Sequence, residues 1–80
     1  MIENDARAAV SAAIAQVAPD IVTEDLDDKA RLRQDLELDS LDFLALIETL
    51  AQTTGVDTPE SDYGQVTTVA DLINYVAARG

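Results

Sequence analysis

The side chain best placed for chemistry in this 80-residue chain is the hydroxyl of Ser40, which stands in the tripeptide Asp39-Ser40-Leu41 between a polar and an apolar segment. A serine at a helix start is open to an incoming enzyme, and helix starts accept anions such as an attached phosphate. The carboxylates of Asp39 and Asp42 beside it can engage basic side chains of that enzyme. Local chemistry therefore allows covalent modification of Ser40, but it also allows a serine that only begins a helix.

Catalysis by the chain itself is not expected. The sequence contains no histidine and no cysteine, so it lacks the usual general base and the thiol nucleophile. The carboxylate pair Asp39 and Asp42 would lie at an exposed helix start, whereas an acid–base pair needs burial or crowding to bring a pKa near the operating pH. No dedicated metal site is expected either, because the acidic run at residues 25–28 lacks the glycine and glutamate of a calcium loop.

Net charge limits the partners that the chain can bind. Sixteen acidic residues stand against five basic ones, for a net charge of −11. Such a surface repels nucleic acid and is steered toward basic patches on other proteins. No apolar run approaches the roughly 20 residues of a membrane span. Because the start Met1–Asp5 is acidic and no cysteine is present, we expect a cytoplasmic protein, and we expect a monomer.

The elements that must position Ser40 are helical. A first helix is predicted up to Pro19, with Asn4 or Asp5 as its cap and a buried face at Ala6, Ala9, Val10, Ala13, Ile14 and Val17. A long connection at residues 20–39 follows. Its spaced apolar residues predict an ordered loop with a helical turn near residues 29–32; they are Ile21, Val22, Leu26, Leu32, Leu36 and Leu38.

A second helix is predicted to start at Ser40, with Asp39 as its N-cap, and to stop at Gly55. Its inward face is predicted at Phe43, Leu46, Ile47 and Leu50, and its surface at Leu41 and Leu44. A short helix follows at residues 59–64. The last helix, residues 68–78, has Thr68 and Asp71 as a cap pair. The expected fold is all-α, a small four-helix bundle of three longer helices and one short helix, with a long first loop, in one domain of residues 1–80.

The segment around Ser40 resembles the modification motif of acyl carrier proteins. Residues 35–41 read Asp-Leu-Glu-Leu-Asp-Ser-Leu, which matches the family pattern D-L-x-x-D-S-L. Pro59 lies at the family's distance after the serine, and residues 66–76 are similar to the family's last helix. The resemblance covers essentially residues 3–78.

The resemblance implies a carrier and not an enzyme. A phosphopantetheinyl transferase would attach 4′-phosphopantetheine from coenzyme A to Ser40, with Asp39 and Leu41 flanking it in the motif. The thiol of this arm would hold an acyl group as a thioester, and in many members the acyl chain can enter the core between helices. The second helix would then dock acyl-loading and acyl-using enzymes that carry basic patches. The docking residues implied are Asp39, Leu41, Asp42, Leu44 and Glu48.

The sequence also departs from the family pattern. Thr54 and Thr58 stand where an aromatic residue and an isoleucine are common, and Tyr63 stands where a small residue is usual and can fill the space. A carrier for fatty-acid, polyketide or other specialised lipid synthesis therefore remains open. So does a peptidyl or aminoacyl carrier, although such carriers more often have a glycine-rich approach to the serine. The third alternative is an acidic helical interaction domain that is not modified.

Overall fold

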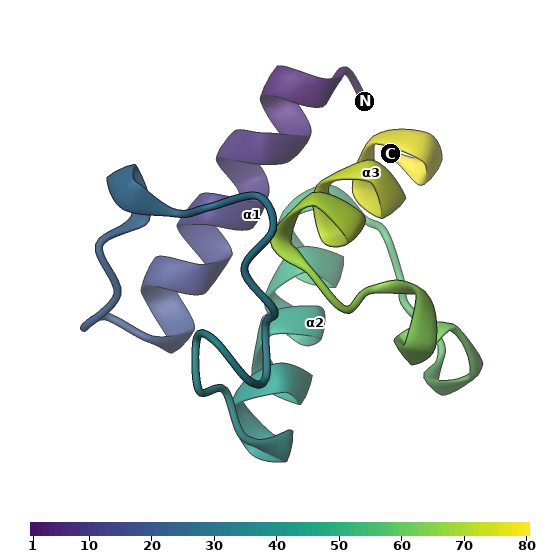
Figure 1. Ribbon diagram of the computed structural model, residues 1–80. Coiled ribbons are helices and arrows are strands. Elements are labelled where there is room, and N and C mark those ends of the chain that lie inside the picture. Colours follow the sequence, from purple (N-terminus) through teal and green to yellow (C-terminus); the bar gives the residue numbers. More distant parts are fainter.

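Three α-helices and two short 3-10 helices make up the fold (Figure 1). The computed structural model describes residues 1–80, apart from the side chain of Asp25. The elements in chain order are α1 (Glu3–Val17), η1 (Thr23–Asp25), α2 (Ser40–Thr54), η2 (Glu60–Gln65) and α3 (Val69–Arg79). The described backbone contains no strand, only an isolated antiparallel bridge between Arg31 and Thr68. The predicted all-α bundle of three longer helices and one short helix is confirmed, and η1 is added to it.

Helix α1 is the element against which both other α-helices pack. Its predicted face is confirmed, since four of its residues are buried and two are partly buried; they are Ala6, Val10, Ala13 and Ile14, then Ala9 and Val17. The predicted cap is wrong. The helix begins at Glu3 after Ile2, so Asn4 and Asp5 lie inside the first turn. Acidic side chains there are favourable because they face the positive end of the helix dipole.

Helix α2 has the predicted boundaries. It begins at Ser40 after the N-cap Asp39, and it ends at Thr54 before Gly55. Gly55 adopts a left-handed conformation with φ of 76°, which glycine tolerates without a steric penalty. The inward face is the predicted one, because the buried residues of the helix are Phe43, Leu46, Ile47 and Leu50.

Helix α3 begins with a complete capping box. The Thr68 hydroxyl accepts a hydrogen bond from the Asp71 backbone N–H, and the Asp71 carboxylate accepts one from the Thr68 backbone N–H. Its next two backbone N–H groups are bound by the long loop between α1 and α2. Val69 donates to the carbonyl of Ala30, at 3.0 Å, and Ala70 donates to the carbonyl of Asp28, at 2.9 Å. The start of α3 is therefore satisfied by its own cap and by a segment some 40 residues earlier in the chain.

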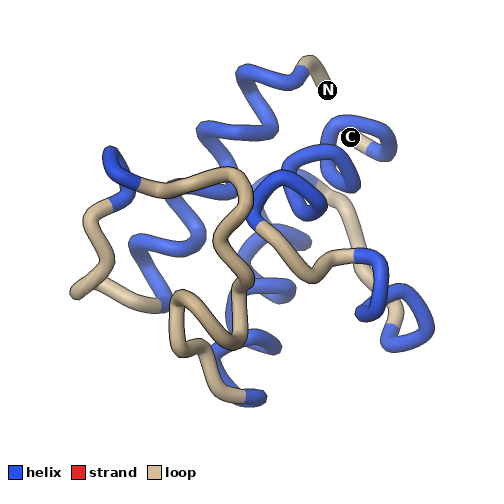
Figure 2. The backbone as a smooth tube through the Cα atoms, viewed as in Figure 1, coloured by secondary structure: helices blue, strands red, loops and turns tan.

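The long loop, residues 18–39, crosses the molecule in front of the helices and is ordered as predicted (Figure 2). Leu32 and Leu38 are buried in the core, and the partly buried apolar residues of the loop are Ala18, Ile21, Leu26, Ala30 and Leu36. Two details of the prediction are wrong. Val22 is 60% exposed, and the helical turn is η1 and not residues 29–32. Residues 28–32 bind the start of α3 instead, and the Leu32 backbone N–H donates to the carbonyl of Thr67 at 2.9 Å.

An ion pair ties the same loop to α1. Both terminal nitrogens of Arg7 donate to the carboxylate of Asp28, at 2.6 and 2.9 Å. This two-point geometry is the strong form of an arginine–carboxylate pair. The hydrogen bond from Arg7 is the main cause that lowers the pKa of the Asp28 carboxyl from its usual value. Asp28 therefore joins α1 through its side chain and α3 through its backbone carbonyl.

The helices of the described residues include none with the length and apolar character that crossing a bilayer requires.

We predict that Asp28→Asn lowers the thermal stability of the chain near pH 7, because it removes the negative charge that pairs with Arg7 and replaces one of the two accepting oxygens with an NH₂ group. The folded-state pKa of Asp28 is lowered, so its stabilisation is present above the ordinary carboxyl pKa of about 4 and is lost as pH falls through the folded value. The melting temperatures of wild type and D28N should therefore differ at pH 7 and converge toward pH 2. Asp20→Asn, an exposed position with the same charge change, serves as the control. An equal difference in melting temperature at pH 7 and pH 2 would show that the ionised Asp28 carboxylate is not the source of the stabilisation.

Candidate functional site

Ser40 is exposed at the first position of α2, and the local sequence fixes it there. The Asp39 carboxylate accepts a hydrogen bond from the Asp42 backbone N–H at 2.8 Å, which caps the helix. The Asp39 carbonyl accepts the first helical bond, from Phe43, at 2.8 Å. Asp39 is therefore a structural N-cap, and the hydroxyl that follows it projects from the end of the helix.

Two backbone donors beside this hydroxyl remain open. Within the described part of the chain, the backbone N–H groups of Ser40 and Leu41 have no hydrogen-bond partner. They lie at the positive end of the α2 dipole, which favours a negative group. A phosphate ester on Ser40 would find donors in reach without a rearrangement of the backbone.

Arg33 is a site residue that the sequence analysis missed. Its Nη2 donates a hydrogen bond to Ser40 Oγ at 3.1 Å, although seven residues separate the two in the chain. Arg33 lies before Ser40 in the chain, on the long loop. The available signal was that three of the five basic residues, Lys29, Arg31 and Arg33, lie in this loop. The contact is a donor to the hydroxyl and not a base, so it does not turn Ser40 into a nucleophile of its own.

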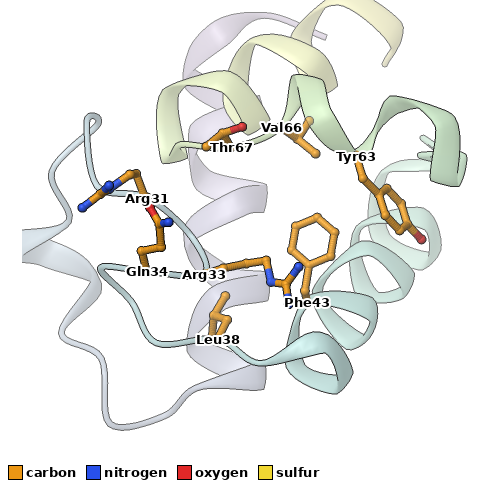
Figure 3. Close-up of a pocket in the computed structure, with 8 residues that line it drawn as sticks. All are labelled: Arg31, Arg33, Gln34, Leu38, Phe43, Tyr63, Val66 and Thr67. Atoms are coloured by element: carbon orange, nitrogen blue, oxygen red, sulfur yellow. The ribbon is translucent and has the colours of Figure 1, made fainter.

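A cleft of about 490 Å³ opens between the long loop, α2 and the segment that precedes α3 (Figure 3). Arg33, which donates to the Ser40 hydroxyl, is one of its lining residues. The walls of the cleft combine apolar and polar side chains. The apolar and aromatic ones are Leu38, Phe43, Tyr63 and Val66, and the polar ones are Arg31, Arg33, Gln34 and Thr67. Figure 3 shows the Arg33 side chain extending from the loop toward Phe43 on α2. The volume of the cleft lies in the range of small-molecule sites, and its walls offer both polar and apolar contacts.

Tyr63 forms one wall of the cleft and packs, partly buried, against the core. Its ring meets the edge of Phe43 with the ring centroids 5.2 Å apart and the planes at 80°. This edge-to-face geometry is favourable for aromatic pairs. Thr58, five residues before Tyr63, is buried, so a polar residue occupies a core position.

The outer face of α2 carries the exposed leucines predicted from the sequence. Leu41 is 77% exposed and Leu44 is 41% exposed. Glu48 is exposed one turn further along, and its spacing from Leu41 and Leu44 places all three on the side opposite the buried residues. Asp39 is exposed at the start of this face, and Asp42 is half-buried beside it. The structure therefore brings the five predicted docking residues to one end and one side of α2.

Metal binding has no support in the structure. The described side chains include no group of three or more carboxylates arranged around a common point. The acidic run considered in the sequence analysis includes Asp25, whose side chain lies outside the described residues.

Comparisons with known proteins agree on one family. A family model described as a phosphopantetheine attachment site matches residues 8–76. The acyl carrier protein of Rubrobacter xylanophilus is 40% identical over 48 residues, which are 60% of this chain and 59% of that protein. The acyl carrier protein of Chlamydia muridarum is 38% identical over 56 residues, 70% of this chain and 73% of that protein. That of Lactobacillus johnsonii is 33% identical over 57 residues, 71% of this chain and 66% of that protein.

We predict that Asp39→Ala destabilises the fold by about 0.5–2 kcal/mol, because the first turn of α2 loses its cap. Asp39→Asn should retain most of the stability, since asparagine is an equally good N-cap. Urea unfolding of the three proteins, with Ser40→Ala as a control expected within about 0.5 kcal/mol of wild type, measures the difference. Equal stability of D39A and wild type would show that the cap bond does not hold the site.

Proposed function

We propose that this chain, which belongs to the acyl carrier protein family, carries acyl groups as thioesters on a 4′-phosphopantetheine arm attached to Ser40. The family match extends over residues 8–76 and includes the motif around this serine. The observation that carries the proposal is the Ser40 hydroxyl itself, exposed at the start of α2 beside open hydrogen-bond donors. Members of this family are carriers and not catalysts, in agreement with a chain that has neither histidine nor cysteine.

The residues at the site fit this prosthetic group. Ser40 Oγ is free to form the phosphodiester, and Arg33 supplies a positive charge at hydrogen-bond distance from it. The cleft that Arg33 lines offers polar and apolar surface. When bound, the arm supplies the thiol that forms the thioester, and the chain's own residues hold and orient it. During loading, the Ser40 hydroxyl would give up its proton to a base of the transferase, and Oγ would form the new bond to the phosphorus next to pantetheine. The pyrophosphate P–O bond of coenzyme A breaks, and adenosine 3′,5′-bisphosphate leaves.

The cargo belongs to lipid or polyketide chemistry in our preferred assignment. The three relatives named above are all acyl carrier proteins, which supports an acyl group over an aminoacyl group. The alternative, a peptidyl or aminoacyl carrier, draws support from the polar wall of the cleft, where Gln34 and Thr67 lie with the two arginines. Loading assays with fatty-acyl, malonyl and aminoacyl donors separate the two.

The partner enzymes would dock on the outer face of α2. Leu41 and Leu44 supply apolar contact there, and the carboxylates of Asp39, Asp42 and Glu48 supply negative charge. A surface of this kind is complementary to a basic patch with a central apolar pocket, and its charge steers the encounter. Because Ser40 stands at the end of this face, the arm attached to it would emerge at the edge of the interface with a docked enzyme.

Incubation of the purified chain with coenzyme A and a phosphopantetheinyl transferase should add the mass of one phosphopantetheine group to wild type and none to Ser40→Ala. Intact mass spectrometry measures the gain, and peptide mapping locates it. Ser11→Ala, a serine on the middle of α1, is the matched control and should be modified like wild type. A wild-type chain that gains no mass with several transferases would favour the unmodified interaction domain.

Leu41→Ala should lower kcat/KM of that loading reaction about five- to tenfold, a typical cost for truncating an apolar anchor at an interface. Folding stability should change little, because the side chain is 77% exposed. Val22→Ala, which removes a 60% exposed aliphatic side chain from the long loop, is the control and should load at the wild-type rate. Equal kcat/KM values for L41A and V22A would show that Leu41 does not contribute to docking of the transferase.

A further inference from the structure

Arg33 differs from the other arginines of the chain in what it binds. Arg7 pairs with Asp28, Arg31 pairs with Asp35, and Arg79 lies within 3.9 Å of Asp62. Among the described side chains, no carboxylate forms an ion pair with Arg33. Its hydrogen bond is made to the hydroxyl of Ser40, at 3.1 Å. In a chain of net charge −11, a cation that no carboxylate neutralises stands at the serine to be modified.

A phosphodiester on Ser40 would add a negative charge at a place where acidic side chains already stand. Asp39 and Asp42 flank the serine, and both carboxylates repel a new negative charge at Oγ. The guanidinium of Arg33 already reaches Oγ, so phosphate oxygens two bonds beyond Oγ would fall within the reach of the same side chain. Arginine suits this role because its planar group can bind two phosphate oxygens at once.

We propose that Arg33 is a positioning residue that binds the phosphate of the arm and directs the arm along the cleft that Arg33 lines. This inference rests on the proposed attachment to Ser40. Arg33 lines the cleft together with Phe43 and Leu38, so a phosphate held by its guanidinium starts the arm at the mouth of that cleft and not on the outer face of α2. Figure 3 shows these lining residues, with the Arg33 guanidinium beside Phe43 and with Tyr63 beyond it.

The test compares the phosphorus signal of loaded proteins. Wild type, Arg33→Gln, Arg33→Lys and the control Lys29→Gln are loaded from coenzyme A, checked by intact mass, and measured by ³¹P NMR at low and high salt. Lys29 is exposed on the same loop, and its loss changes the net charge by the same amount. The ³¹P resonance of K29Q should therefore coincide with that of wild type. R33Q should shift the ³¹P resonance by more than the line width, and R33K should fall between the two. High salt should move the wild-type resonance toward that of R33Q.

Coincident ³¹P resonances of wild type and R33Q would overturn the proposal while leaving the attachment to Ser40 intact. Absence of any mass gain on wild type would instead refute the attachment itself. A second measurement does not need R33Q to be loaded. In ¹⁵N-labelled wild type, the Arg33 Nε–H signal, assigned by its absence from the R33Q apoprotein, should move on loading more than the Arg7 and Arg79 signals. An Arg33 signal that does not move would also overturn the phosphate contact.

Discussion

The backbone hydrogen bonds between the long loop and the start of α3 are the interaction on which the site depends. Ala30 and Asp28 accept from the first N–H groups of α3, and Leu32 donates to Thr67. These bonds satisfy donors that a helix start otherwise leaves to solvent, so the loop replaces water at that end of α3. They also fix the position of residue 32, and therefore of the neighbouring Arg33. Without them the loop would keep its ion pair to α1 and its buried leucines, but it would lose the backbone pairing that fixes residue 32 beside Arg33.

Between that anchor and α2, the chain turns sharply at Glu37, which has a left-handed backbone with φ of 59°. A residue other than glycine costs roughly 1–2 kcal/mol in this conformation. The turn sends Leu38 into the core, where it is 3% exposed, and leaves Asp39 free to cap α2. Burial of a leucine contributes about 1.5–3 kcal/mol, enough to offset the backbone strain. The position of Ser40 thus follows from the strained turn and the buried leucine together.

The sequence predicted the parts of this structure that depend on local patterns. The boundaries of α2 followed from the cap residue Asp39 and from Gly55, and the buried faces followed from helical spacing. The cap of α1 was predicted wrongly because Asn4 and Asp5 both suit an N-cap, whereas the helix begins after Ile2, which makes no side-chain cap bond. The pairing of the loop with α3 and the contact of Arg33 with Ser40 join residues distant in the chain. No periodicity encodes such contacts, since they depend on where the whole loop lies.

The strength of the Arg33 contact decides what it can do for a bound arm. Ion pairs at exposed positions contribute about 0.2–1 kcal/mol, and Arg33 is exposed. A contribution of 1 kcal/mol changes an equilibrium only about fivefold, since 1.4 kcal/mol corresponds to tenfold. Arg33 would therefore bias the arm toward the cleft without locking it there. An enzyme docked on the outer face of α2 could withdraw the arm with a small fraction of its binding free energy, because a single good interface contact supplies more than 1 kcal/mol. A carrier needs this balance, since its cargo must be held between encounters and released at each one.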